Sequence, residues 1–105
     1  MILRLVGLPV KPDRASDLEE SFAKAQPRIV ALPNCHHVSL LRTGGDDEPD
    51  YLTLSIWTDR EDLEAYRRSD LFKAIWPPIR DTLRAKPWAH TYDYLAGDIP
   101  DFGSP

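Results

Sequence analysis

The sequence predicts an α+β fold in which one antiparallel sheet carries helices on a single face. Three observations indicate this fold. Residues 51–57 alternate Tyr, Thr, Ser and Trp with Leu, Leu and Ile, which is the period of a strand with two different faces. Residues 18–29 place apolar side chains at helical spacing. Residues 43–50, which are rich in Gly and acidic side chains, separate two strand-like segments and are typical of a hairpin loop.

Composition limits the classes of protein that the chain can belong to. A chain of 105 residues is one domain, which we assign to residues 1–96, followed by a tail at residues 97–105. With 13 basic and 17 acidic side chains and no basic patch, nucleic acid is not an expected partner. No apolar run approaches the roughly 20 residues of a membrane span. The single cysteine cannot form an internal disulfide, so we expect a reducing, cytoplasmic location.

The first strand is predicted at residues 2–10, and the first helix follows it. Arg4 lies on an otherwise apolar strand face, where it needs a carboxylate, water or a ligand because a lone buried charge is costly. Asp13 or Ser16 can cap the helix, and Ser16 and Glu19 have the spacing of a capping box.

The second strand is predicted at residues 35–42 and the third at residues 51–57. His36 and His37 point to opposite faces of their strand and therefore cannot share a metal ion, so no metal site is expected. After the third strand, Thr58 and Glu61 have capping-box spacing for a short helix.

The second half of the chain ends in a further helix and a fourth strand. Ser69 can cap the helix, which is predicted to break at Pro77-Pro78 and to restart as far as Leu83. Pro87 opens the last strand, one face of which is unusually aromatic: Trp88, His90, Tyr92 and Tyr94.

The predicted order is β-α-β-β-α-β, which is that of a ferredoxin-like fold with its helices on one side of the sheet. The other side also carries apolar and aromatic side chains, which are not expected to stay in contact with water. A homodimer that packs two sheets face to face would cover it.

These segments resemble the antibiotic biosynthesis monooxygenase (ABM) family of the dimeric α+β-barrel superfamily, over residues 1–95. The resemblance implies cofactor-free oxidation of phenolic polyketides or quinols to quinones, or haem degradation, because members include both kinds of enzyme. The segments that carry it are Leu32-Pro33-Asn34-Cys35, Leu54-Ser55-Ile56-Trp57, Ala65-Tyr66-Arg67-Arg68-Ser69 and Leu71-Phe72.

The haem-degrading branch is not matched by this chain. Its Asn, Trp and His positions correspond to Gly7, Tyr66 and Trp76, so no imidazole remains to hold iron. We therefore expect neither haem nor any other cofactor.

The polyketide-oxidising branch is matched more closely. Its pocket tryptophan corresponds to Trp57, and its Tyr and Arg correspond to Tyr66 and Arg80, whereas Thr53 stands where the branch has Asn. His36 or His37 can serve as a base, and the family's strand parity favours His36. The candidate catalytic residues are thus Arg80, His36 and Tyr66, and the candidate substrate-binding residues are Thr53, Trp57 and Trp76.

The resemblance leaves two functions open. One is a cofactor-independent monooxygenase that oxidises a phenolic or quinol-like aromatic molecule with O2. The other is a non-catalytic dimeric barrel that binds a small aromatic or apolar ligand. We predict a cavity between the sheet and the helices after the third strand, with Leu52, Leu54 and Ile56 facing a partner sheet. The opposite parity stays open at this point, because both faces of the strand are apolar enough to be buried.

Overall fold

The structure, a computed structural model, describes residues 1–43 and 50–98. Most of the predicted hairpin loop and most of the predicted tail therefore lie outside the described residues. The elements lie in the order β1 (Ile2–Pro9), the 3-10 turn η1 (Pro12–Arg14), α1 (Ala15–Val30), β2 (Cys35–Thr43), β3 (Asp50–Trp57), α2 (Arg60–Arg67), α3 (Asp70–Arg80) and β4 (Trp88–Asp93).

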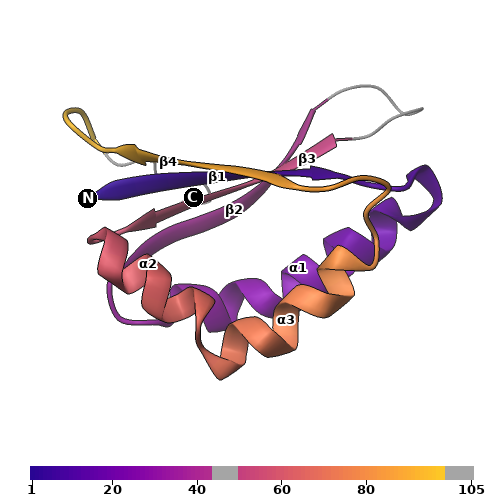
Figure 1. Ribbon diagram of the computed structural model, residues 1–105, viewed down its shortest axis with the longest axis horizontal. Coiled ribbons are helices and arrows are strands. Elements are labelled where there is room, and N and C mark those ends of the chain that lie inside the picture. Colours follow the sequence, from indigo (N-terminus) through magenta and orange to yellow (C-terminus); the bar gives the residue numbers. More distant parts are fainter. Residues whose placement is uncertain (44–49, 99–105) are drawn as a thin grey trace, which may run out of the picture.

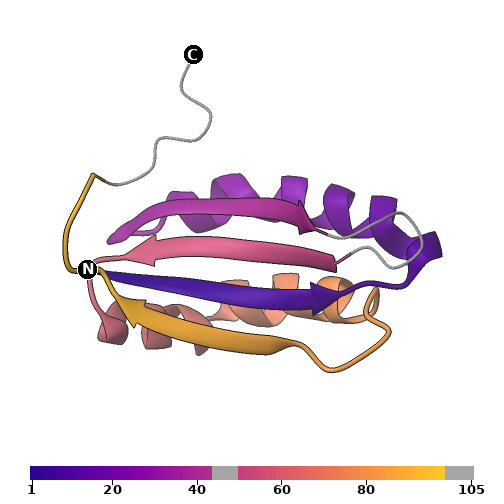
Figure 2. The same ribbon diagram turned by 90° about the horizontal axis from the view of Figure 1, so that it is seen from above.

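Within the described residues the strands form one sheet in the order β2-β3-β1-β4, and each neighbouring pair is antiparallel. Figure 1 shows α1, α2 and α3 on the same side of this sheet, and Figure 2 shows the strands side by side above the helices. This is the ferredoxin-like arrangement, with the helical segment after β3 divided into two. The predicted α+β fold is confirmed.

The strand register assigns each side chain to a face of the sheet. Ile2 lies opposite Trp57 and Leu8 opposite Tyr51, and these four side chains are buried in the two hydrophobic clusters between the sheet and the helices. Because side chains alternate along a strand, their neighbours point to the outer face, which no helix covers. The outer face carries Leu3, Leu5, His37, Ser39, Leu41, Leu52, Leu54, Ile56, Trp88, His90 and Tyr92.

Two helices begin at different residues from those predicted. The turn η1 starts at Pro12 and leads directly into α1 at Ala15, so the Ser16 capping box is not used. The cap of α2 is Asp59 rather than Thr58, because the Asp59 carboxylate accepts a hydrogen bond of 3.0 Å from the Asp62 N–H. The predicted cap of α3 at Ser69 is confirmed.

A break in the helix is predicted at Pro77-Pro78. In the structure, α3 continues through both prolines and ends at Arg80. A proline inside a helix removes the hydrogen bond to the carbonyl four residues earlier. Those carbonyls belong to Lys73 and Ala74, both of which are exposed, so water can satisfy them. The helix continues through both prolines despite the two lost hydrogen bonds.

Candidate functional site

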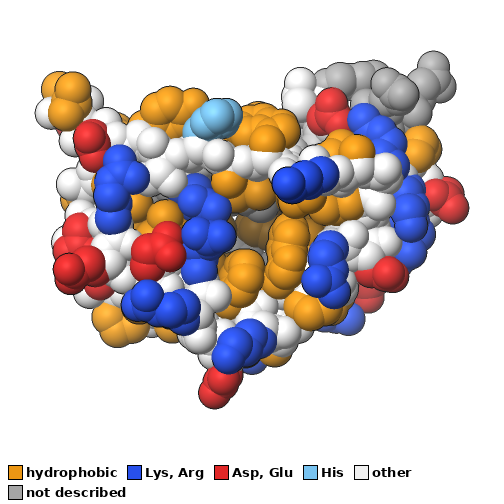
Figure 3. Space-filling view, in the orientation of Figure 1, with side chains coloured by type: hydrophobic (Ala, Val, Ile, Leu, Met, Phe, Trp, Pro, Cys, Tyr) orange, Lys and Arg blue, Asp and Glu red, His pale blue; other side chains and the backbone are white. Residues whose placement is uncertain are grey.

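A cavity of about 360 Å³ lies between the sheet and the helices. Residues of all four strands form its wall on the sheet side, and residues of α1, α2 and α3 form the opposite wall. Figure 3 shows the cavity as a hollow surrounded by hydrophobic side chains. The side chains that line it include Arg4, Thr53, Ser55, Trp57, Tyr66, Arg67, Phe72 and Trp76.

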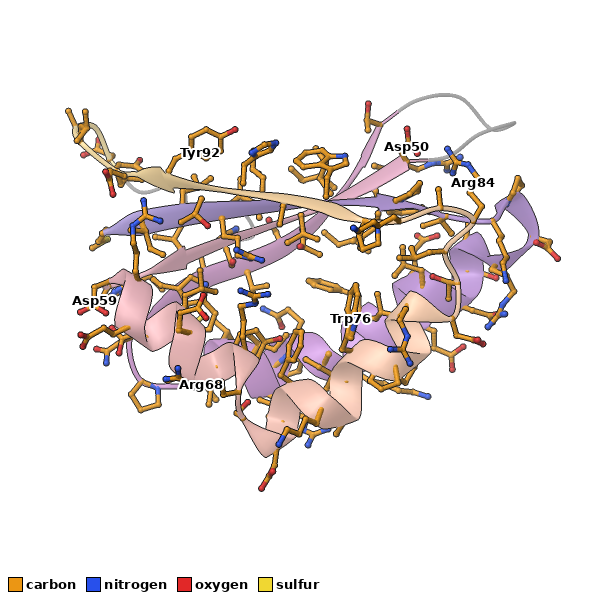
Figure 4. The ribbon with its side chains drawn as sticks, viewed as in Figure 1. Asp50, Asp59, Arg68, Trp76, Arg84 and Tyr92 are labelled. Atoms are coloured by element: carbon orange, nitrogen blue, oxygen red, sulfur yellow. The ribbon has the colours of Figure 1, made fainter. Side chains whose placement is uncertain are left out.

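A continuous row of aromatic rings forms one side of the cavity. Trp57 stacks on Tyr66, with ring centroids 5.1 Å apart and planes 26° apart. Tyr66 meets Phe72 edge to face at 5.3 Å, and Phe72 stacks on Trp76 at 6.0 Å with planes 8° apart. In Figure 4, Trp76 extends from α3 toward the sheet. Offset-stacked and edge-to-face rings of this kind present faces on which another flat ring can pack.

The junction between α2 and α3 sets the position of two of these rings. The Ser69 hydroxyl donates to the Tyr66 carbonyl oxygen at 2.6 Å and accepts from the Phe72 N–H at 3.1 Å. One side chain thus joins the last turn of α2 to the first turn of α3. The two helices meet at Ser69 with their aromatic side chains directed to the same cavity.

The cavity also contains a few polar groups. Thr53 and Ser55 project from β3, and their hydroxyls make no hydrogen bond to any of the described side chains or backbone. Trp57 Nε1 is buried and has no acceptor among the described residues. Burial, and secondarily the charge of a Cys35 thiolate, raise the pKa of Tyr66 well above its usual value. Tyr66 therefore keeps its proton at neutral pH and can act as a hydrogen-bond donor.

Two guanidinium groups lie at one side of the cavity. Arg4, on β1, is half-buried and donates from Nη1 to the Thr91 hydroxyl at 3.1 Å. Arg67, on α2, is more exposed and pairs with Glu64 at 3.2 Å. Burial lowers the pKa of Arg4, the charge of Arg67 lowers it further, and Glu64 opposes the change. Figure 3 shows Lys and Arg side chains beside the hollow.

The structure brings together four of the six side chains proposed from the sequence: Thr53, Trp57, Tyr66 and Trp76 all line the cavity. The other two lie elsewhere. Arg80 is the last residue of α3 and is exposed, because a guanidinium at a helix end is better hydrated outside than in an apolar cavity.

The placement of His36 against the helices is also corrected. A bulge in β2 lets Cys35 pair with Trp57 and His37 with Ile56, so His36 has no partner on β3. The bulge turns Cys35 toward the helices and leaves His36 exposed, with its Nε2 2.8 Å from the Thr58 hydroxyl. His37 belongs to the outer face. Neither histidine lines the cavity.

Sequence reasoning missed Phe72, Arg67 and Arg4 as cavity residues. Phe72 and Arg67 were noted only within the segments that carry the family resemblance. Arg4 had a clearer signal, since a charged residue on an apolar strand face needs a partner.

Two further features of the described residues bear on function. No group of three or more His, Cys, Asp or Glu side chains within residues 1–43 and 50–98 is placed to hold a metal ion. None of the helices in this part of the chain is long and apolar enough to cross a lipid bilayer.

Comparison with known proteins identifies similar chains. The family model described as antibiotic biosynthesis monooxygenase matches residues 1–76. No curated protein matches the chain in sequence. A crystal structure described as an antibiotic biosynthesis monooxygenase is 17% identical, with a TM-score of 0.80 over 91% of this chain and 100% of that one.

Two other solved structures are also similar. A conserved protein of Methanosarcina mazei is 22% identical, with a TM-score of 0.78 over 88% of this chain and 91% of its own. A mutant of SnoaB, a cofactor-independent oxygenase from Streptomyces nogalater, is 17% identical, with a TM-score of 0.74 over 95% of this chain and 97% of its own. At these identities the structural likeness shows the fold alone.

Proposed function

The chain belongs to the antibiotic biosynthesis monooxygenase family, and on that premise we propose that it is a cofactor-independent monooxygenase of flat phenolic molecules. The observation that carries the proposal is the row of four aromatic rings along a largely apolar cavity that also contains hydrogen-bond donors. A flat ring can pack against this row while its oxygen meets the donors.

The size and lining of the cavity support binding of a small aromatic molecule. Its volume of about 360 Å³ lies near the lower end of the range for ligand sites, roughly 300–1,000 Å³. Apolar walls exclude water, which strengthens the few polar interactions inside. The substrate is therefore expected to have two or three fused rings at most.

The chemistry needs only an electron-rich substrate and O2. A phenol loses its proton, and the phenolate passes one electron to O2 to give a phenoxyl radical and superoxide. These recombine at the carbon para to the oxygen, and the resulting hydroperoxide eliminates water to leave a quinone. For 1-naphthol, C10H8O and O2 give 1,4-naphthoquinone, C10H6O2, and one H2O, so no external reductant is required.

Tyr66 and Thr53 are the groups that we expect to act on the substrate. The protonated Tyr66 hydroxyl donates to the phenolate oxygen, and its raised pKa keeps it in the donor form. The Thr53 hydroxyl is a further donor for the superoxide or peroxide oxygen. No Asp, Glu or His lines the cavity among the described residues, so the phenol proton is expected to leave to solvent.

The proposal extends to assembly and location. Apolar side chains cover the outer face of the sheet, and Leu41, Trp88 and Tyr92 are 38%, 46% and 50% exposed in the single chain. A homodimer that packs two such faces together would bury them. The free, buried Cys35 is compatible with the reducing conditions of the cytoplasm.

Oxygen uptake with 1-naphthol, in buffer containing a metal chelator, tests this function. We expect uptake that depends on the protein, and a loss of about a hundredfold in kcat for Tyr66→Phe, the magnitude typical of removing one oxyanion donor. Tyr94→Phe is the matched control, because the Tyr94 hydroxyl donates to the Asp98 carbonyl and does not line the cavity. Tight binding of naphthol without any uptake would instead identify a non-catalytic binding barrel.

A further inference from the structure

The two arginines of the cavity are not needed to bind an unsubstituted phenol. Arg4 has one hydrogen bond, to a neutral hydroxyl, and makes no ion pair with a carboxylate in the part of the chain that the structure describes. Arg67 shares its charge with Glu64. Since a half-buried guanidinium is costly without an anion, the cavity has about one positive charge left to be matched by a ligand.

We propose that Arg4, assisted by Arg67, forms an anion subsite that selects aromatic substrates carrying a carboxylate. The inference rests on the proposed function, and it names the substrate class of the same cavity. Arg4 is on β1 and Arg67 is on α2, so they approach the ligand from the sheet side and from the helix side. The aromatic row holds the rings, and the guanidiniums hold the acid group.

The chemistry of the subsite fits a carboxylate better than other anions. A guanidinium is planar and presents its donors as a fork that matches the two oxygens of a carboxylate. Arg4 uses Nη1 for Thr91 and has other N–H donors available. A doubly charged phosphate would need a second unpaired cation, whereas Arg67 is already paired with Glu64.

Charge distribution gives a second reason. The whole chain has a formal charge of −4, yet no Asp or Glu lines the cavity among the described residues. The cavity holds two like charges, and the charge of Arg67 disfavours the protonated form of Arg4. An anion bound between them would relieve this repulsion.

Calorimetric titration of 2-naphthoate and of its uncharged methyl ester tests the subsite. The two probes have the same rings, so their difference in affinity reports the carboxylate alone. We expect the wild-type protein to prefer the acid by about tenfold or more, the value of one hydrogen-bonded charge pair. Added salt should reduce the preference. Equal binding of acid and ester to the wild-type protein would overturn the proposal without any variant.

Variants locate the subsite. Arg4→Gln should lower the affinity of the acid much more than that of the ester and so remove most of the preference, and Arg67→Gln should have the same effect to a smaller degree. Arg68→Gln is the control, because Arg68 is adjacent in sequence but does not line the cavity and points away from it in Figure 4. A preference that falls equally in Arg68→Gln would indicate general surface charge and contradict the proposal. Circular dichroism checks that Arg4→Gln is folded. If it is not, the subsite is tested by Arg67→Gln and by the wild-type protein's relative affinity for the acid and the ester.

Turnover separates this inference from the proposed function. With 1-hydroxy-2-naphthoate, C11H8O3 and O2 give the quinone carboxylate C11H6O4 and H2O, and kcat/KM should exceed that for 1-naphthol. If 1-naphthol is oxidised equally well, the subsite is wrong and the monooxygenase stands. If the acid binds selectively and neither compound consumes O2, the subsite stands and the monooxygenase is wrong.

Discussion

Among single residues, Tyr66 combines the two properties that the proposed reaction requires, which are an aromatic surface and a protonated hydroxyl group. Its ring contacts Trp57 on one side and Phe72 on the other, so it is part of the aromatic wall against which we propose that the substrate packs. Its hydroxyl remains protonated because burial disfavours the charged form. Replacement by Phe keeps the wall and removes the donor, which is why Tyr66→Phe separates binding from turnover.

The buried acids of the chain predict that stability falls at alkaline pH. Burial raises the pKa of Cys35, Tyr51 and Tyr66 in the folded protein. The unfolded chain loses these protons first, from about pH 8.5 for Cys and about pH 10 for Tyr, so the stability present below pH 8 is lost as pH rises. Urea unfolding from pH 7 to pH 11 should show this decline, and Tyr66→Phe should make it shallower above pH 10. A constant free energy of unfolding across this range would contradict it.

The sequence predicted the strand residues of the site better than the others. Thr53, Ser55 and Trp57 share one face because β3 keeps its period of two along its whole length. The same argument failed for His36, since one extra residue in β2 reverses the parity on one side of the bulge. No sequence pattern marks that bulge. Arg80 was assigned by family alignment, and the exposed end of a helix does not restrict a long side chain to one direction.

The junction of α2 and α3 is the element on which the geometry of the aromatic row depends. Ser69 caps α3 and also binds the Tyr66 carbonyl, so it fixes the angle between two short helices of 8 and 11 residues. The sequence predicted this cap, whereas it did not predict that α3 continues through Pro77 and Pro78. A proline pair removes two backbone donors, but whether the helix continues depends on the packing around it, which is a property of the tertiary structure.

Ser69→Ala tests the importance of this junction. We expect a loss of about 1 kcal/mol in the free energy of unfolding, the usual value of an N-cap hydroxyl. Ligand affinity should fall as well, because Tyr66 and Phe72 lose their common anchor. Ser69→Thr, which keeps the hydroxyl, is the control for urea unfolding and naphthoate titration. If Ser69→Ala behaves like the wild-type protein in both measurements, the cap does not set the geometry of the site.

The sheet as a whole is more apolar than a single chain can keep in contact with water. Leu5 lies at the centre of the outer face, opposite Leu54 on one neighbouring strand and His90 on the other. The alternation that places Trp57 in the cavity also places these residues on the outer face, so one sequence pattern predicts both the lining of the cavity and the apolar face that we propose a second copy covers. The ferredoxin-like fold could therefore be predicted from the strands and their order.

Sedimentation equilibrium tests the proposed homodimer. We expect a dimer at micromolar concentration for the wild-type protein and a folded monomer for Leu5→Arg, because a charge at the centre of the outer face opposes its burial. Val30→Arg is the control, since Val30 is an exposed apolar residue at the end of α1, away from the sheet. A wild-type protein that remains monomeric at these concentrations would remove the basis for a face-to-face dimer.

Oxidation of 1-naphthol under 18O2 tests the central claim most directly. The proposed reaction inserts one atom of O2 into the quinone and releases the other as water. Mass spectrometry of the product, taken before carbonyl exchange with solvent, should therefore show one 18O atom per naphthoquinone, with one O2 consumed for each quinone and no hydrogen peroxide released. Product formation that is no faster than in buffer, or hydrogen peroxide in place of labelled quinone, would contradict a monooxygenase acting in this cavity.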